Sequence, residues 1–161
     1  MLTPLEIEDR AARYCHLYAV HPPVIPRAIA IADGFTVLPL GTVPPLDRVV
    51  RGRDPIYECT GRRGRCPHSL DGCDERDQSW HVMLQLADRE LRRNGPRLPE
   101  RHVERFARAV MLPADEFMED LMISRRNIAK LVEVHAYVPE HVIRARITDL
   151  GRARFSIVAV S

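Results

Sequence analysis

The chain has 161 residues, of which 45% are hydrophobic and 29% are charged, and its formal net charge is +2. A chain of this length buries roughly 70% of its unfolded surface, so this composition fits one compact domain and excludes wholesale disorder. No apolar run reaches the ~18 residues of a membrane span, and the acidic first residues lack the apolar stretch of a secretory signal. We therefore expect a cytoplasmic chain without membrane association, whose cysteines are reduced.

The first half of the chain predicts two helices and two short strands. Apolar residues recur at helical spacing and are followed by proline, which removes a backbone donor and restricts the residue before it. The expected elements are an amphipathic helix over residues 4–20, a short helix over residues 26–32, and strands over residues 35–38 and 55–58. Cys15 lies on the apolar face of the first helix, so we expect it to belong to the core.

Helical patterns dominate the second half. Asn94-Gly95-Pro96 is a strong stop signal, and three later prolines each open a helix at its first turn. The expected helices cover residues 80–93 (capped by Asp77 or Ser79), 99–112, 113–122, 125–136 (capped by Ser124) and 139–151. The second of these carries an apolar stripe that we expect to be buried, formed by Val103, Phe106, Ala107, Val110 and Met111. The tail over residues 155–160 has strand character.

Several blocks of the sequence, taken in order, resemble the ImmA/IrrE family of zincin-fold metallopeptidases, which control bacterial, phage and mobile-element repressors. The matching blocks are Pro22–Val37, Ile56-Tyr57, Gln78–His81, Glu100–Pro113 and Val138–Gly151. Together, and in the family's order, they are spread along nearly the whole chain. The resemblance implies an α+β fold, in which a small β-sheet packs against a helical bundle, in a single domain over residues 1–161.

The catalytic motif of that family is altered in this sequence. In zincins, H-E-x-x-H places two imidazoles one helical turn apart so that both bind one zinc ion, and the glutamate takes a proton from zinc-bound water. The aligned stretch is His81-Val82-Met83-Leu84-Gln85. The resemblance implies that His81 keeps the first ligand and Glu100 the third, whereas Val82 replaces the general base and Gln85 replaces the second ligand.

These replacements change the chemistry expected at the site. Valine cannot accept a proton, and a glutamine carbonyl is a much poorer zinc ligand than imidazole. We therefore assign no catalytic residue and expect at best a weak, vestigial metal site at His81 and Glu100. We favour His81 as a partly buried helix histidine that is hydrogen-bonded to Glu100 or Gln85.

A polar segment over residues 59–78 is rich in Gly, Arg, Asp and Cys. Its Cys59, Cys66, His68 and Cys73 could close a tetrahedral structural zinc site, and a metal would order a segment that has few hydrophobic residues. The six-residue spacings between the cysteines differ from the C-x2-C of zinc knuckles. Unpaired thiols or one disulfide therefore stay open as alternatives, and an iron–sulfur cluster is the less favoured use of the same residues.

The predicted helix pair over residues 125–150 has helix-turn-helix character. Its second helix carries Arg144 and Arg146, which could contact phosphates or bases of nucleic acid. In the resembled family this block packs as part of the helical domain, and we favour that role.

The sequence thus predicts a degenerate zincin-like regulator, a pseudo-peptidase that binds a protein partner such as a transcriptional repressor in a phage, mobile-element or stress-response switch. One alternative is an active zinc metallo-endopeptidase with an altered site that cleaves a repressor. A second is a DNA-binding module that uses the C-terminal helix pair. The cofactor that the sequence allows is zinc in a structural role, bound by the cysteine segment, and no cofactor is expected for catalysis.

Overall fold

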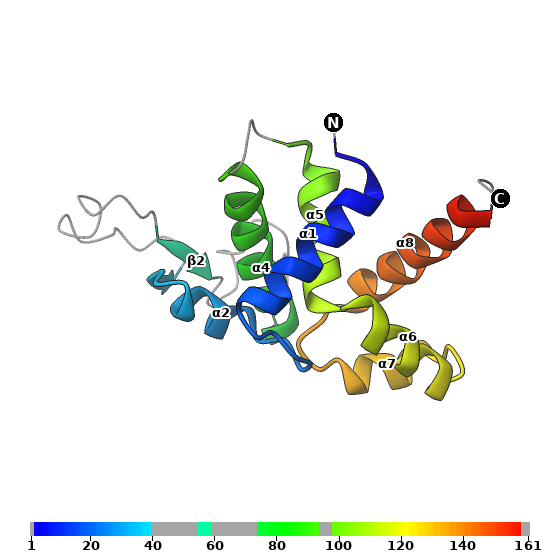
Figure 1. The fold of residues 1–161 in the computed structure, drawn as a ribbon. Coiled ribbons are helices and arrows are strands. Elements are labelled where there is room, and N and C mark those ends of the chain that lie inside the picture. The colour runs from blue at the N-terminus through cyan, green and yellow to red at the C-terminus, as the bar shows by residue number, and fades with distance from the viewer. Residues whose placement is uncertain (1, 40–54, 59–73, 94–97, 159–161) are drawn as a thin grey trace.

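The computed structural model describes residues 2–39, 55–58, 74–93 and 98–158, with side chains up to Gly151. Helices form most of this part of the chain and two short strands form a parallel sheet, so the fold is α+β (Figure 1). The elements are α1 (Pro4–Leu17), α2 (Pro26–Ala32), β1 (Val37–Pro39), β2 (Ile56–Glu58), α4 (Glu75–Arg92), α5 (Glu100–Met111), α6 (Ala114–Ile123), α7 (Ile128–Val134) and α8 (Glu140–Val158).

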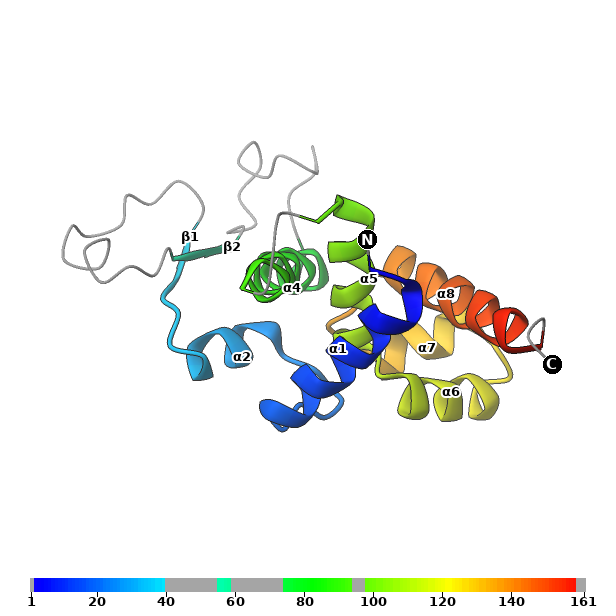
Figure 2. The ribbon, with the colours of Figure 1, turned by 45° about the horizontal axis from the view of Figure 1, so that its top comes forward.

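The sheet consists of β1 and β2, both close to where the sequence predicts strands. The two strands are parallel, with Val37 opposite Ile56 and Pro39 opposite Glu58. Ile56 is fully buried, and both α2 and α4 pack close to the sheet (Figure 2). The small sheet therefore lies at one end of the molecule, and hydrogen bonds from Gln85 and Arg89 of α4 join it to that helix.

The core is centred on α5, which packs between α1 and α4 and also contacts α8. The predicted stripe of this helix is confirmed: all five of its residues are buried, and Phe106 is fully inaccessible to solvent. The Phe106 ring meets the Tyr14 ring edge to face at a centroid distance of 5.6 Å, a geometry that aromatic pairs favour. Cys15 packs against the same core, as expected.

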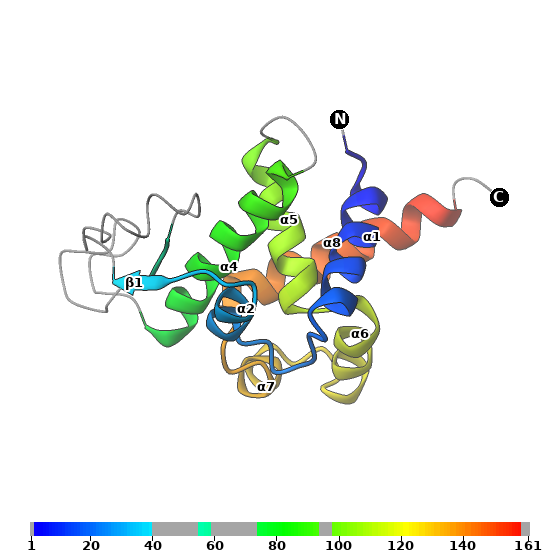
Figure 3. The same ribbon diagram turned by 60° about the vertical axis from the view of Figure 1, so that its left-hand side comes forward.

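Helices α4 and α5 form an antiparallel hairpin. The chain leaves the C-terminal end of α4 and enters α5 at the same end of the pair (Figures 1 and 3). Glu100, the first residue of α5, therefore lies at the end of the hairpin where Arg92 finishes α4. This arrangement decides which residues of the two helices can meet.

The start of α4 differs from the prediction. Asp74, rather than Asp77 or Ser79, caps the helix, because its carboxylate accepts a hydrogen bond from the Asp77 N–H at 2.8 Å. The helix therefore begins at Glu75, and Asp77 lies in its first turn, where a negative charge interacts favourably with the helix dipole.

The helix predicted over residues 125–136 is also corrected. Ser124 ends α6, and the helix that follows is capped by Asn127, whose side chain accepts a hydrogen bond from Lys130 N. Arg125 and Arg126 have φ angles of 52° and 59°. This left-handed conformation cannot continue a right-handed helix, so α7 begins only at Ile128.

Residues 155–158 are helical where the sequence predicts a strand, and residues 159 and 160 of that predicted strand lie outside the described residues. Helix α8 continues through Gly151 to Val158 and extends away from the other helices (Figures 1 and 2). Helix propagation adds one backbone hydrogen bond per residue, whereas a strand needs a neighbouring strand to pair with. Continuation of the helix therefore outweighs the strand propensity of residues 155–158.

None of the helices within the described ranges combines the length and the apolar character needed to cross a bilayer.

Candidate functional site

Helix α4 carries the residues aligned with the zincin motif, and Gln85 is the most constrained of them. Its Oε1 accepts a hydrogen bond from Tyr57 N at 2.9 Å, and its Nε2 donates to Tyr57 O at 2.6 Å. Nε2 also donates to the backbone carbonyl of His81 at 3.2 Å. The side-chain amide thus bonds to strand β2 as a neighbouring strand would, and its oxygen lone pairs face a protein donor.

Val82 lies in the core. Its side chain is 2% exposed and belongs to the same hydrophobic cluster as Met83 and Leu86. In the resembled family this position holds the glutamate that activates water. A carboxylate here would lose its hydration without a partner, which costs several kcal/mol.

His81 and Glu100 do not share one end of the hairpin. Glu100 is exposed at the start of α5, next to the end of α4 at Arg92. With a rise of 1.5 Å per residue, Gln85 lies about 10 Å farther along the α4 axis and His81 about 16 Å farther. His81 is half-buried, as expected. Its recorded hydrogen bond to Gln85 is made by its backbone carbonyl, which accepts from Gln85 Nε2.

No group of three or more His, Cys, Asp or Glu side chains that could hold a metal ion occurs among the described residues. The predicted structural ligands Cys59, Cys66, His68 and Cys73 all lie outside those residues. The zinc site in that segment therefore stays a prediction from the sequence.

Cys15 has neither the exposure nor the ionisation of a reactive thiol. Burial raises the pKa of its thiol to about 11, with a smaller contribution from Glu116. Its Sγ lies 3.9 Å from the Val110 carbonyl oxygen. The thiolate is the nucleophilic and metal-binding form, so this cysteine acts as a small core residue.

The two arginines proposed for nucleic-acid contact lie in opposite environments. Arg144 is exposed and pairs with Glu140 one turn earlier on α8, at 2.7 Å. Arg146 is fully buried. The prediction that Arg146 contacts nucleic acid is corrected, because its guanidinium has no access to an external phosphate or base.

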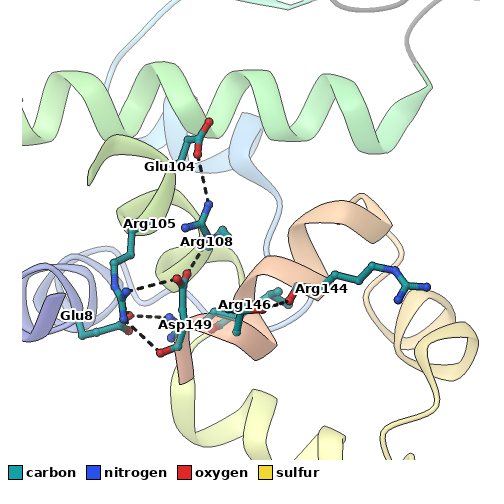
Figure 4. A network of polar contacts seen from close by, with 9 residues as sticks. Glu8, Glu104, Arg105, Arg108, Arg144, Arg146 and Asp149 are labelled. Atoms are coloured by element: carbon teal, nitrogen blue, oxygen red, sulfur yellow. Dashed lines mark hydrogen bonds and ion pairs between the residues drawn. The ribbon is translucent and has the colours of Figure 1, made fainter. Parts of the chain in front are cut away.

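Arg146 instead belongs to an ion-pair network that joins three helices (Figure 4). Glu8 of α1 accepts hydrogen bonds from Arg146 at 2.7 Å and from Arg105 at 3.2 Å. Asp149 of α8 accepts from Arg108 at 2.7 Å and from Arg105 at 3.3 Å. The network fixes α1, α5 and α8 relative to one another.

The same network closes the C-terminal end of α5. Arg146 Nε donates to the carbonyl oxygen of Leu112, the residue that follows α5, at 2.9 Å. Arg146 Nη2 is buried without a hydrogen-bond partner in the described part of the chain. Buried ion pairs contribute little net stability but are costly to break, so we interpret this cluster as a device that fixes helix geometry.

Sequence reasoning missed this network. An ion pair between Glu104 and Arg108 follows the i, i+4 rule and could be expected from spacing alone. Glu8 and Arg146 are 138 positions apart, and no local pattern connects them.

Comparison with known proteins gives no match: no family model, no curated protein and no solved structure matches the chain. The functional assignment therefore depends on the residues and their geometry.

Proposed function

We propose that the chain is a degenerate zincin-like regulator of the ImmA/IrrE type, which acts by binding a protein partner instead of cleaving it. The partner class that this resemblance implies is a transcriptional repressor of a phage, mobile-element or stress-response switch. The proposal includes the finer fold assignment, in which the β2–α4 unit corresponds to the strand and active-site helix of a zincin.

One observation carries the proposal: both polar atoms of the Gln85 amide are hydrogen-bonded to Tyr57 of β2. The position of the second metal ligand thus serves the attachment of α4 to the sheet. Burial of Val82 adds to this argument, because the position of the general base belongs to the hydrophobic core. Because positions 82 and 85 both stabilise the structure, the chain can keep a zincin-like fold without hydrolysing peptides.

Neither alternative function gains support from the described residues. A peptidase needs a base near the metal, and position 82 offers an aliphatic side chain. A DNA-binding helix needs free cations, and of the two arginines predicted to contact nucleic acid, Arg146 is buried and Arg144 is paired with Glu140.

The test combines hydrolysis and binding. Purified protein is incubated with zinc or manganese and with the repressor encoded beside it, and the products are examined by mass spectrometry and by size-exclusion chromatography with light scattering. We expect an intact repressor in a complex with the chain. Specific cleavage that disappears in His81→Ala would overturn the proposal, and so would the absence of both cleavage and complex.

A further inference from the structure

An open groove with a mostly apolar lining lies between α6 and α8. It has a volume of about 500 Å³, and its apolar lining comes from Met118, Leu121 and Met122 of α6 and from Ile147 and Leu150 of α8. Met122 is 76% exposed and the adjacent Ile123 is 74% exposed. Large exposed apolar side chains beside a groove are typical of an interaction site.

Two cations complete the lining. Arg125 and Arg126 are exposed, line the groove, and form no ion pair with any residue in the described part of the chain. Among the residues whose side chains the structure describes, no acidic one lines the groove. A ligand that fits it therefore needs apolar groups to fill the groove and negative charge at the end where the arginines lie.

The backbone holds these arginines in place. Arg126 N donates to Leu121 O and Arg125 N donates to Met122 O, which is the Schellman arrangement at a helix end. Glycine is the usual residue at the left-handed position of this motif, because other residues are strained there. Two consecutive arginines in this conformation are a local outlier beside an apolar groove, and such outliers concentrate at functional sites.

We infer that the α6–α8 groove binds an amphipathic helix of a protein partner, with an apolar stripe in the groove and Asp or Glu side chains against Arg125 and Arg126. A groove between two helices suits the recognition of a third helix by apolar residues spaced three and four positions apart. A membrane surface fits less well, because recognition of anionic lipid uses clusters of roughly four to eight cations. This inference rests on the proposed partner-binding function and assigns the surface that performs it.

The probe is a synthetic helical peptide with leucines on one face and glutamates flanking them. A second peptide has lysine in place of each glutamate. Binding to the full-length chain, labelled with ¹³C at its methionine methyl groups, is followed by NMR. Met118 and Met122 line the groove, whereas Met83 and Met111 are buried in the core and serve as internal references.

We expect the glutamate peptide to shift the Met118 and Met122 methyl signals and to leave those of Met83 and Met111 unchanged. The affinity should fall at least tenfold in Met122→Asp and in the double variant Arg125→Glu/Arg126→Glu, and the lysine peptide should bind at least tenfold more weakly. Leu5→Asp and Arg13→Glu, which change exposed residues of α1, are the matched controls and should keep the affinity.

Other outcomes would overturn the inference. These are equal binding of the two peptides, absence of binding by both, or unchanged affinity in the groove variants. Concentration-dependent shifts without peptide, together with a doubled mass, would assign the groove to a second copy of the chain. Shifts caused only by phosphatidylserine vesicles would assign it to lipid. If the peptide does not bind the groove but the chain still forms a complex with the repressor, this inference is wrong and the proposed function holds through another surface.

Discussion

Gln85 and Tyr57 form a pair of hydrogen bonds in which a side-chain amide takes the place of a strand. The N–H and the C=O of Tyr57 are both satisfied by the Gln85 side chain, at 2.9 and 2.6 Å. The contact joins the sheet to α4 across a chain separation of 28 residues. It makes Gln85 a structural residue in this fold and gives a direct test of that role.

Replacing Gln85 should destabilise the protein. Gln85→Ala leaves both backbone groups of Tyr57 without their partner, which costs about 1–3 kcal/mol of unfolding free energy. Gln85→Glu should also destabilise, because a carboxylate cannot donate to the Tyr57 carbonyl. Urea denaturation measures both effects. The control is Arg92→Ala on the exposed face of α4, and an effect of Gln85→Ala no larger than that of the control would contradict the structural role.

Arg146 and Arg144 should differ sharply although they lie two positions apart. Arg146→Ala leaves the Glu8 carboxylate with one partner fewer and the Leu112 carbonyl unpaired, so we expect a loss of about 3–5 kcal/mol. Arg144→Ala removes an exposed pair with Glu140 and should change stability by less than about 1 kcal/mol. Thermal unfolding followed by circular dichroism compares the two variants. Similar effects would contradict the burial of Arg146.

His135 should make stability sensitive to acid. Burial lowers the pKa of its imidazole below the ordinary value of 6.5, although Asp120 at 3.1 Å acts in the opposite direction. The unfolded chain therefore binds the proton more readily, and stability contributed by the neutral form is lost as the pH falls below about 6.5.

The test of this dependence compares wild type with His135→Gln by urea denaturation at pH 7.5 and pH 5.5. The variant should lose less stability on acidification than wild type does. His16→Gln, at an exposed position of α1, is the control. A wild-type stability that rises on acidification, or an unchanged difference in His135→Gln, would show that this histidine does not carry the effect.

Bound zinc should depend on the cysteine segment and not on α4. Three thiolates and an imidazole bind zinc far better than His81, Gln85 and Glu100. Cys66→Ser should therefore remove metal from the purified protein, and His81→Ala should leave the metal content unchanged. Inductively coupled plasma mass spectrometry gives the stoichiometry. Metal that survives Cys66→Ser but disappears in His81→Ala would restore a peptidase-type site.

The candidate site could be predicted from the sequence only in part. The motif position identified Gln85 as a departure from the family pattern, and its chemistry argued against hydrolysis. Its hydrogen bonds to Tyr57 required the structure, because they depend on how β2 lies beside α4. The groove also escaped prediction, since its lining comes from two helices that the sequence places far apart.

Local patterns of the sequence determined most helices, both strands and the buried stripe of α5. Proline fixes the starts of α2 and α5, and apolar spacing fixes the face of α5 that is buried. These features depend on residues within a few positions of one another, through backbone restriction and helical period.

Only the tertiary structure determined which charged and polar residues are buried and which groups they pair with. Arg146 and Arg144 are equally basic in the sequence, yet only Arg146 is surrounded by α1 and α5, where Glu8 and the Leu112 carbonyl receive its hydrogen bonds. Burial, pairing and groove formation depend on contacts between distant segments. Removing a charged side chain from water costs free energy, and this cost must be offset by oppositely charged or polar groups. Where the neighbouring sequence offers no such group, as for Arg146, the packing of distant helices supplies it.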